Sequence, residues 1–176
     1  APFLTGNMPV LSEGDVLPQT YSYLRDSSRQ ALVAQMQLHL HTALRDIWQT
    51  RSPDTQALHT PEELLVLASL VEKETAVADE RPLIAGGFLN RLAKGMKLQT
   101  DPTVIYAVTH ANPPLGRPLT RTDLQTPSPY NTYLNSGLPP RPICAPGMQA
   151  LEATAHPAHT QALSFVANRS GGHSFA

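Results

Sequence analysis

The sequence has few features typical of disulfide-stabilised, metal-binding or nucleic-acid-binding proteins. Its 176 residues include one cysteine, Cys144, which excludes an internal disulfide and any metal site built from several cysteines. The formal net charge of -1 provides no electrostatic footprint for nucleic acid or for an anionic membrane surface. No run of about 18 apolar residues is present, so no segment of this sequence is predicted to span a membrane.

Several catalytic signatures are also missing. There is no His-Glu-x-x-His motif, no glycine-rich phosphate loop and no Gly-x-Ser-x-Gly elbow. His39 and His41 are two apart and would face away from each other on a helix. His156 and His159 have a spacing that could bind a metal, but no second motif supports this. We therefore expect no metal and no cofactor.

Length and proline content describe one domain with long fixed loops. A chain of 176 residues has the size of an ordinary domain, and we treat residues 1–176 as one unit. It has 17 prolines, against a usual content of about 5%. The segment 109–146 holds many of them and is expected to be a long structured loop. Because the chain starts at Ala1 with neither an initiator methionine nor a signal peptide, we interpret it as a fragment.

The pattern of apolar residues predicts an α+β fold, mainly helical, with a small β element near the C-terminus. Apolar periodicity and capping residues predict helices at residues 30–49, 60–78, 82–93, 103–108 and 147–155. A strand is expected at 163–167, followed by a turn at Gly171-Gly172 and a partner strand at 173–175. The pair Gly86-Gly87 inside the third helix predicts close packing against a neighbouring backbone.

One glutamate, Glu72, falls on the apolar side of the second predicted helix. Thr60 can cap this helix, and Glu63 completes a capping box. At about 100° per residue, Glu72 lies roughly 40° from Ala68 on a stripe of apolar side chains. Lys73 and Glu74 are expected to point elsewhere. A desolvated carboxyl group has a raised pKa, which suits a general acid.

Structural explanations exist for each candidate residue. Glu72 could reach water at the edge of the stripe or pair with an arginine, because structural ion pairs are common. Asp101 precedes a proline and could simply cap the next helix. Tyr130, Asn131 and Tyr133 lie in a stiff loop, where they could contact the flat faces and hydroxyl groups of sugars or only pack locally.

Taken in order, short motifs along the whole chain resemble those of the YceG-like family of endolytic murein transglycosylases. They include Leu17-Pro-Gln-Thr-Tyr21, Ala68-Ser-Leu-Val-Glu-Lys-Glu-Thr75, Phe88-Leu-Asn-Arg-Leu92, Met96-Lys-Leu-Gln-Thr-Asp-Pro-Thr-Val-Ile-Tyr106, Ser128-Pro-Tyr-Asn-Thr-Tyr133, Gly137-Leu-Pro-Pro140, Ala145-Pro-Gly147, Ala155-His-Pro157 and Gly171-Gly-His-Ser-Phe175. Eight motifs of the catalytic part appear in this order with the expected gaps, so the resemblance is specific.

The resemblance implies cleavage of peptidoglycan glycan strands between N-acetylmuramic acid and N-acetylglucosamine. It places the catalytic glutamate at the first acid of the Glu-Lys-Glu motif, which is Glu72. It further implies an N-terminal anchor in the inner membrane, a LysM-like subdomain and a periplasmic catalytic domain. This sequence would lack most of the anchor and the subdomain. Glycan strands, and through them peptidoglycan synthases, are the implied partners.

Residues and resemblance together predict a lytic transglycosylase with Glu72 as its single general acid and base. Its product would be a 1,6-anhydro end, formed without water. We expect six residues to bind glycan or to hold Glu72: Gln99, Asp101, Tyr106, Tyr130, Asn131 and Tyr133. Two alternatives stay open, a muramidase that uses Asp101 as a second carboxylate and a catalytically silent peptidoglycan-binding scaffold.

Overall fold

The computed structural model describes residues 4–110, 114–167 and 172–176. Within these ranges the chain forms five α-helices, which are α1 (Arg29–Thr50), α2 (Pro61–Glu74), α3 (Arg81–Ala93), α4 (Asp101–Thr109) and α5 (Met148–Ala155). Strands β1 (Phe165–Ala167) and β2 (His173–Phe175) pair antiparallel, with Phe165 opposite Phe175. The predicted α+β class with a small C-terminal β element is therefore confirmed. The predicted turn at Gly171-Gly172 lies partly outside the described residues.

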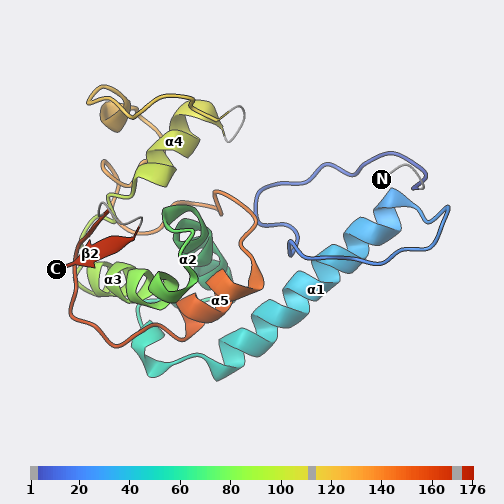
Figure 1. Cartoon of the computed structure of the whole chain (residues 1–176), viewed down its shortest axis with the longest axis horizontal. Helices are drawn as coiled ribbons and strands as arrows, with labels where there is room; N and C mark the ends of the chain where they lie inside the picture. Colours follow the sequence, from blue (N-terminus) through green and yellow to red (C-terminus); the bar gives the residue numbers. More distant parts are fainter. Residues whose placement is uncertain (1–3, 111–113, 168–171) are drawn as a thin grey trace.

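Helix α2 is the centre of the molecule, and α1, α3, α4 and α5 all pack against it (Figure 1). Its start follows the predicted pattern: the Thr60 hydroxyl accepts a hydrogen bond from the Glu63 N–H at 3.2 Å. Every residue from Leu64 to Val71 is buried. Eight consecutive buried residues point in all directions around a helix, so the predicted single apolar stripe is wrong.

Helix α1 extends from the helical body and carries the N-terminal segment along its first half (Figure 1). Ser28 caps the helix by accepting a hydrogen bond from the Ala31 N–H at 3.0 Å. The Arg29 N–H bonds to the Thr5 carbonyl at 2.9 Å, which ties the N-terminal segment to the helix start. This arrangement brings residues near Glu13 back towards α2 and α4.

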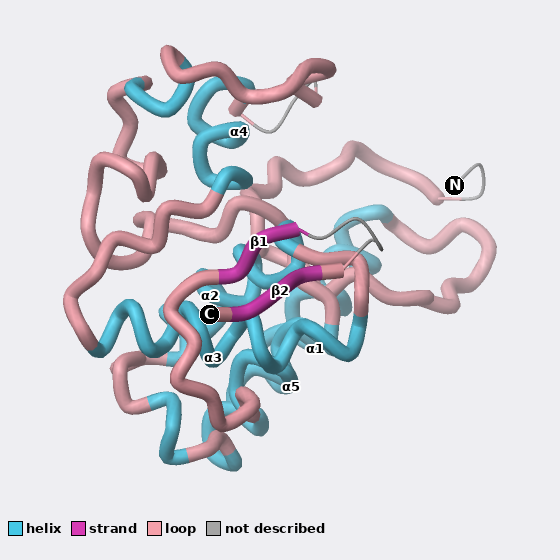
Figure 2. The backbone as a smooth tube through the Cα atoms, turned by 60° about the vertical axis from the view of Figure 1, so that its left-hand side comes forward, coloured by secondary structure: helices cyan, strands magenta, loops and turns pink. Residues whose placement is uncertain are grey.

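Helix α3 uses its paired glycines to let a later segment approach closely, as predicted. A Cβ atom at Gly86 would lie 2.7 Å from the Ala158 carbonyl oxygen. A Cβ atom at Gly87 would lie 3.5 Å from the Phe165 ring, which belongs to β1. The hairpin is thereby seated on α3 (Figure 2). Through this contact, β2 brings His173 close to Glu74 at the end of α2.

Two predicted helix boundaries are wrong. Helix α2 ends at Glu74 rather than near residue 78, because Thr75 is extended and starts a turn. Helix α4 starts at Asp101, with Thr100 at the capping position, so Asp101 is the first helical residue rather than the cap. The segment between α4 and α5 is irregular over its described residues apart from the short 3-10 helix Asp123–Gln125, in line with the predicted long loop.

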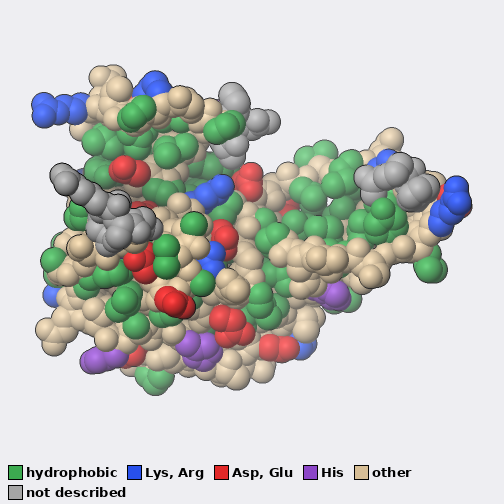
Figure 3. Space-filling model, in the orientation of Figure 1, with side chains coloured by type: hydrophobic (Ala, Val, Ile, Leu, Met, Phe, Trp, Pro, Cys, Tyr) green, Lys and Arg blue, Asp and Glu red, His purple; other side chains and the backbone are tan. Residues whose placement is uncertain are grey.

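None of the described helices is both long and apolar enough to cross a membrane. The described ranges also contain no cluster of three histidine, cysteine, aspartate or glutamate residues suited to hold a metal ion. Charged side chains instead gather where the α4 segment meets the helical body (Figure 3).

Candidate active site

A cavity of about 280 Å³ opens where the end of α2 meets the start of α4 and the C-terminal hairpin. Six of the residues that line it carry large polar or charged groups: Glu74, Arg91, Gln99, Asp101, Tyr133 and His173. They come from five separate parts of the chain. Only the folded structure therefore brings them together, and we call this space the Glu74 cavity.

Glu74 is the last residue of α2 and is largely buried at the cavity wall. Its carboxylate Oε2 accepts a hydrogen bond from the Thr100 hydroxyl at 2.5 Å. Burial raises the pKa of the Glu74 carboxyl above its ordinary value, and the Thr100 hydrogen bond and the charge of His173 partly oppose this. The negative charge of Asp101 raises the pKa further. A carboxyl group with a raised pKa beside an open cavity has the properties of a general acid.

Asp101 and Tyr133 face the same cavity as a bonded pair. The Tyr133 hydroxyl donates to Asp101 Oδ1 at 2.6 Å. Burial and this hydrogen bond raise the pKa of the Tyr133 phenol well above its usual range, so the phenol keeps its proton. Asp101 is thus held as an acceptor at the mouth of the cavity, close enough to Glu74 to influence its charge.

Gln99 occupies a constrained turn that leads into α4. Its φ of 51° is in the left-handed region, which is uncommon for a residue with a Cβ atom. Arg91 holds this turn from α3, donating to the Lys97 and Leu98 carbonyls at 2.9 and 3.0 Å and to Gln99 Oε1 at 3.4 Å. The arginine also donates to the Leu163 carbonyl, so it connects the turn to the strand of the hairpin.

A buried group of threonines fixes the floor beneath these residues. The Thr100 N–H donates to the Thr132 hydroxyl at 3.1 Å, and the Thr103 and Thr132 hydroxyls are 2.8 Å apart. The Thr103 hydroxyl also donates to the Thr100 carbonyl at 2.7 Å. Buried and satisfied polar groups of this kind specify one arrangement. They position the Thr100 hydroxyl that contacts Glu74.

His173 is anchored by a second carboxylate. Glu80 accepts the His173 N–H at 2.7 Å and lies 2.7 Å from the His173 ring Nδ1. The hydrogen bonds from His173 lower the pKa of the Glu80 carboxyl. The Thr75 hydroxyl donates to the same carboxylate at 3.2 Å, so Glu80 connects the end of α2 to the hairpin.

Glu72, the residue predicted from the sequence, faces a different neighbourhood. Its Oε2 accepts the Gly147 N–H at 3.1 Å at the start of α5, and its Oε1 lies 3.7 Å from Arg81 Nη2. Its side chain is 30% exposed. The contacts with Gly147 and Arg81 join the end of α2 to the start of α5 and to α3. Glu72 is not among the described residues that line the Glu74 cavity.

The predicted binding residues divide into three groups. Gln99, Asp101 and Tyr133 share the Glu74 cavity. Tyr106 and Tyr130 form a ring pair with centroids 4.7 Å apart, and both line a separate hollow beside the N-terminal segment. Asn131 is fully buried.

The contacts of Asn131 are internal to its own loop. Its Nδ2 donates to the Leu124 and Thr126 carbonyls at 3.1 and 2.9 Å, and its Oδ1 accepts the Tyr133 N–H at 2.9 Å. These bonds hold the loop that carries Tyr133.

Sequence reasoning missed Glu74, Arg91 and His173 as site residues. Glu74 lies about 60° from Val71 at the edge of the expected stripe, and no feature of α2 alone distinguishes it. Gln99 and Asp101 are expected from the sequence to bind glycan, but the residues opposite them in the cavity come from distant parts of the chain.

The fold and the cavity define a mainly helical α+β domain with two carboxyl groups, Glu74 and Asp101, at the wall of one pocket. The sequence pattern of the YceG-like family matches residues 4–176, and the chain belongs to this family.

Two curated relatives and one solved structure are similar to the chain. An endolytic murein transglycosylase of Bacillus subtilis (strain 168) is 39% identical over 161 residues, covering 90% of this chain and 42% of the relative. A protein of the same name from Streptococcus pneumoniae (strain D39) is 34% identical, covering 91% of this chain and 29% of the relative. A crystal structure of a YceG-like protein from Listeria monocytogenes matches with a TM-score of 0.77 and 36% identity, over 93% of this chain and 52% of that one. The chain thus spans about half or less of the length of these proteins.

Proposed function

We propose that this domain is a lytic transglycosylase that cleaves the glycosidic bond after N-acetylmuramic acid in peptidoglycan strands. The names of the two relatives supply the reaction class. One observation of the structure supports it most strongly: Glu74, a carboxyl group with a raised pKa, lines a cavity together with Asp101 and Tyr133. The cavity is lined by several polar and charged side chains, which can form hydrogen bonds with the hydroxyl and amide groups of a sugar.

The reaction needs one group that first donates and then accepts a proton. Protonated Glu74 donates to the glycosidic oxygen while positive charge develops on the muramic acid ring. The resulting Glu74 carboxylate then removes the proton from the C6 hydroxyl of the same sugar. That oxygen closes on the anomeric carbon and gives a 1,6-anhydro end. Because the nucleophile belongs to the substrate, its effective concentration is high and no water is consumed.

The two acids of the Glu-Lys-Glu motif differ in their suitability for this role. Glu72 is the assignment from the sequence and the family resemblance, and it stays a prediction. Its carboxylate accepts the Gly147 N–H and lies 3.7 Å from Arg81 Nη2, so both of its oxygens are already engaged by neighbouring residues. Glu74 lines the cavity, and burial raises the pKa of its carboxyl group. We therefore propose Glu74 as the acid and base, with Glu72 as a positioning residue that joins α2 to α5.

A muramidase is the second candidate, because Asp101 lines the same cavity as Glu74. In a hydrolase the second carboxylate would attack the sugar or activate water. In the transglycosylase, the negative charge of Asp101 would instead stabilise the positive charge that develops on the sugar ring. The same charge already raises the pKa of Glu74, so it acts across the cavity.

The location of peptidoglycan determines where the domain would act. Peptidoglycan lies outside the cytoplasmic membrane, so the domain would act on the periplasmic side of the inner membrane, attached to it through an anchor in a longer protein. Peptidoglycan synthases, which make the strands, would then be its neighbours.

Mass analysis of products from purified glycan strands tests the reaction. A transglycosylase gives muramic acid ends that are one water lighter than hydrolysis products. Reducing muramic acid ends as the main product would support the muramidase instead. Binding of strands without any cleavage would support the third alternative, a catalytically silent peptidoglycan-binding scaffold.

A further inference from the structure

A second cavity lies directly beside the Glu74 cavity, and we propose that it binds the peptide stem of the muramic acid that is cleaved. This inference rests on the proposed function, because the stem is attached to the lactyl group of that sugar. The cavity has a volume of about 320 Å³ and is formed by the end of α2, one side of α4, the segment before α5 and the N-terminal segment.

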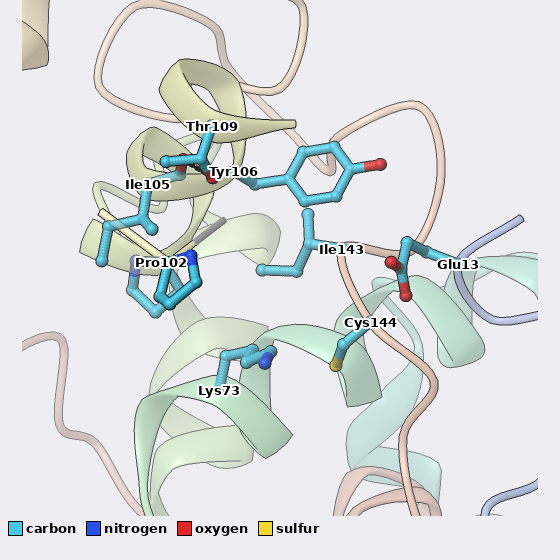
Figure 4. Close-up of a pocket in the computed structure, with 9 residues that line it drawn as sticks. Glu13, Lys73, Pro102, Ile105, Tyr106, Thr109, Ile143 and Cys144 are labelled. Carbon is cyan, nitrogen blue, oxygen red and sulfur yellow. Dashed lines mark hydrogen bonds between the residues drawn. The ribbon is translucent and has the colours of Figure 1, made fainter. Parts of the chain in front are cut away.

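The second cavity has opposite charges on its walls and an apolar floor between them. Lys73 enters from α2 and Glu13 from the N-terminal segment, while Pro102, Ile105 and Ile143 supply apolar surface. Figure 4 shows Lys73 and Glu13 on different sides of the cavity, with Cys144 between them in this view. A ligand that carries both a carboxylate and an ammonium group on a short apolar chain matches this layout.

Neither charge is used by the fold. The Lys73 ammonium and the Glu13 carboxylate form no hydrogen bond or ion pair with any other residue in the described part of the chain. Lys73 is exposed and Glu13 is partly exposed, so both charges are accessible to a ligand with groups of opposite sign. Peptide stems offer such partners, since their acidic residues carry carboxylates and a diamino acid carries a free ammonium group.

The second cavity is close enough to the Glu74 cavity for one substrate to occupy both. On α2, Lys73 lines the second cavity and the next residue, Glu74, lines the first. On α4, Asp101 lines the first cavity and the next residue, Pro102, lines the second. Neighbouring residues are about 3.8 Å apart between Cα atoms, and an extended peptide covers about 3.3 Å per residue. An extended stem of three residues covers about 10 Å, which is the reach that the proposal requires between a sugar at Glu74 and the second cavity.

Cys144 does not give the second cavity a chemistry of its own. The Cys144 thiol donates to the Ser69 carbonyl at 3.3 Å, and burial raises its pKa to about 12. A thiol of that pKa stays protonated at neutral pH and is a poor nucleophile. The second cavity is therefore a binding site, with the proton transfers confined to the Glu74 cavity.

The test is titration of the protein with a muramyl tripeptide whose third residue is a diamino acid with free ammonium and carboxylate groups. Loss of a charge-assisted hydrogen bond predicts that Lys73→Met weakens binding about tenfold. Glu13→Gln should weaken it similarly. Lys94→Met, at the exposed end of α3, is the matched control and should bind like the wild type. When the carboxylates of this tripeptide are amidated, it should bind weakly to the wild type. Lys73→Met should not weaken its binding further.

The outcomes separate this inference from the proposed function. No binding of the tripeptide, or equal binding by wild type and Lys73→Met, would overturn the stem site whether or not strands are cleaved. Binding that depends on Lys73 would support it, even if the wild type failed to cleave strands and the proposed reaction had to be abandoned. For an active enzyme, Lys73→Met should also lower the ratio of kcat/KM for stem-bearing strands to that for amidase-stripped strands.

Discussion

Replacing Thr100 by valine tests the protonation state of Glu74 without touching the carboxyl group. The Thr100 hydroxyl donates to Glu74 Oε2 at 2.5 Å and thereby stabilises the ionised form. Its removal raises the pKa of the Glu74 carboxyl further. Valine keeps the shape of threonine, and the backbone N–H and carbonyl of residue 100 stay available for their bonds to Thr132 and Thr103.

The size of the effect follows from the hydrogen bond. A bond to a charged group contributes about 1.5–3 kcal/mol, and a pKa change of one unit corresponds to about 1.4 kcal/mol. Since part of the Glu74 carboxylate stays exposed, we expect a shift near the lower limit, about one pH unit. If Glu74 must be protonated in the free enzyme, kcat/KM falls as the pH rises through its pKa. In Thr100→Val this decline should move about one unit to higher pH.

The assay is the pH profile of kcat/KM on purified glycan strands. Thr50→Val removes a threonine hydroxyl that bonds to backbone carbonyls at the end of α1, far from the cavity, and its profile should coincide with that of the wild type. An unchanged decline in a folded Thr100→Val variant would show that Glu74 is not the group whose titration limits activity. A shift to lower pH would contradict the assigned direction of the hydrogen bond.

Three further predictions concern the surroundings of Glu74. Asn131→Ala should lower the free energy of unfolding by roughly 3 kcal/mol in chemical denaturation, because it removes three hydrogen bonds of about 1 kcal/mol each, to the Leu124 and Thr126 carbonyls and from the Tyr133 N–H; a loss near zero would show that the loop is held by other contacts. Asp101→Asn keeps an acceptor for the Tyr133 hydroxyl, so the products should stay anhydro while kcat falls; a switch in product type would require direct participation of Asp101 in the reaction. Dialysis against a chelator should leave activity unchanged, since we expect no metal; loss that is restored by zinc would refute this.

Much of the fold could be predicted because its signals are local. Ser28 and Thr60 cap their helices through side-chain bonds to nearby N–H groups, which the sequence shows directly. The paired glycines Gly86 and Gly87 indicated a close contact, although not its partner, which lies more than seventy residues later for both. Local chemistry specifies such features before the chain folds.

The candidate site is less accessible to prediction from the sequence, because it depends on contacts between residues distant in sequence. A helical wheel compares residues within α2 only, and it assumes that one side faces the core. In the structure α2 is buried on all sides from Leu64 to Val71, so the wheel could not discriminate between Glu72 and Glu74. What distinguishes Glu74 is Thr100, 26 positions later, and what distinguishes Glu72 is Gly147 at the start of α5.

Comparing Glu74→Gln with Glu72→Gln distinguishes the two candidate acids of the proposed reaction. Both changes remove one carboxylate from the same helix end and keep the shape of the side chain. Folding is checked first by thermal unfolding. Because the pKa of Glu74 is raised in the folded state, its charge is destabilising above that pKa, and Glu74→Gln should be at least as stable as the wild type at neutral pH.

The decisive quantity is kcat on purified glycan strands. Positioned acid and base catalysis contributes roughly 10²–10⁴-fold, so Glu74→Gln should lose at least about 10²-fold. Glu72→Gln should keep most of its activity, because glutamine still accepts the Gly147 N–H and loses only a partly exposed ion pair. The opposite result, an active Glu74→Gln and an inactive but folded Glu72→Gln, would return the catalytic role to Glu72 and contradict the assignment of Glu74 as the general acid and base.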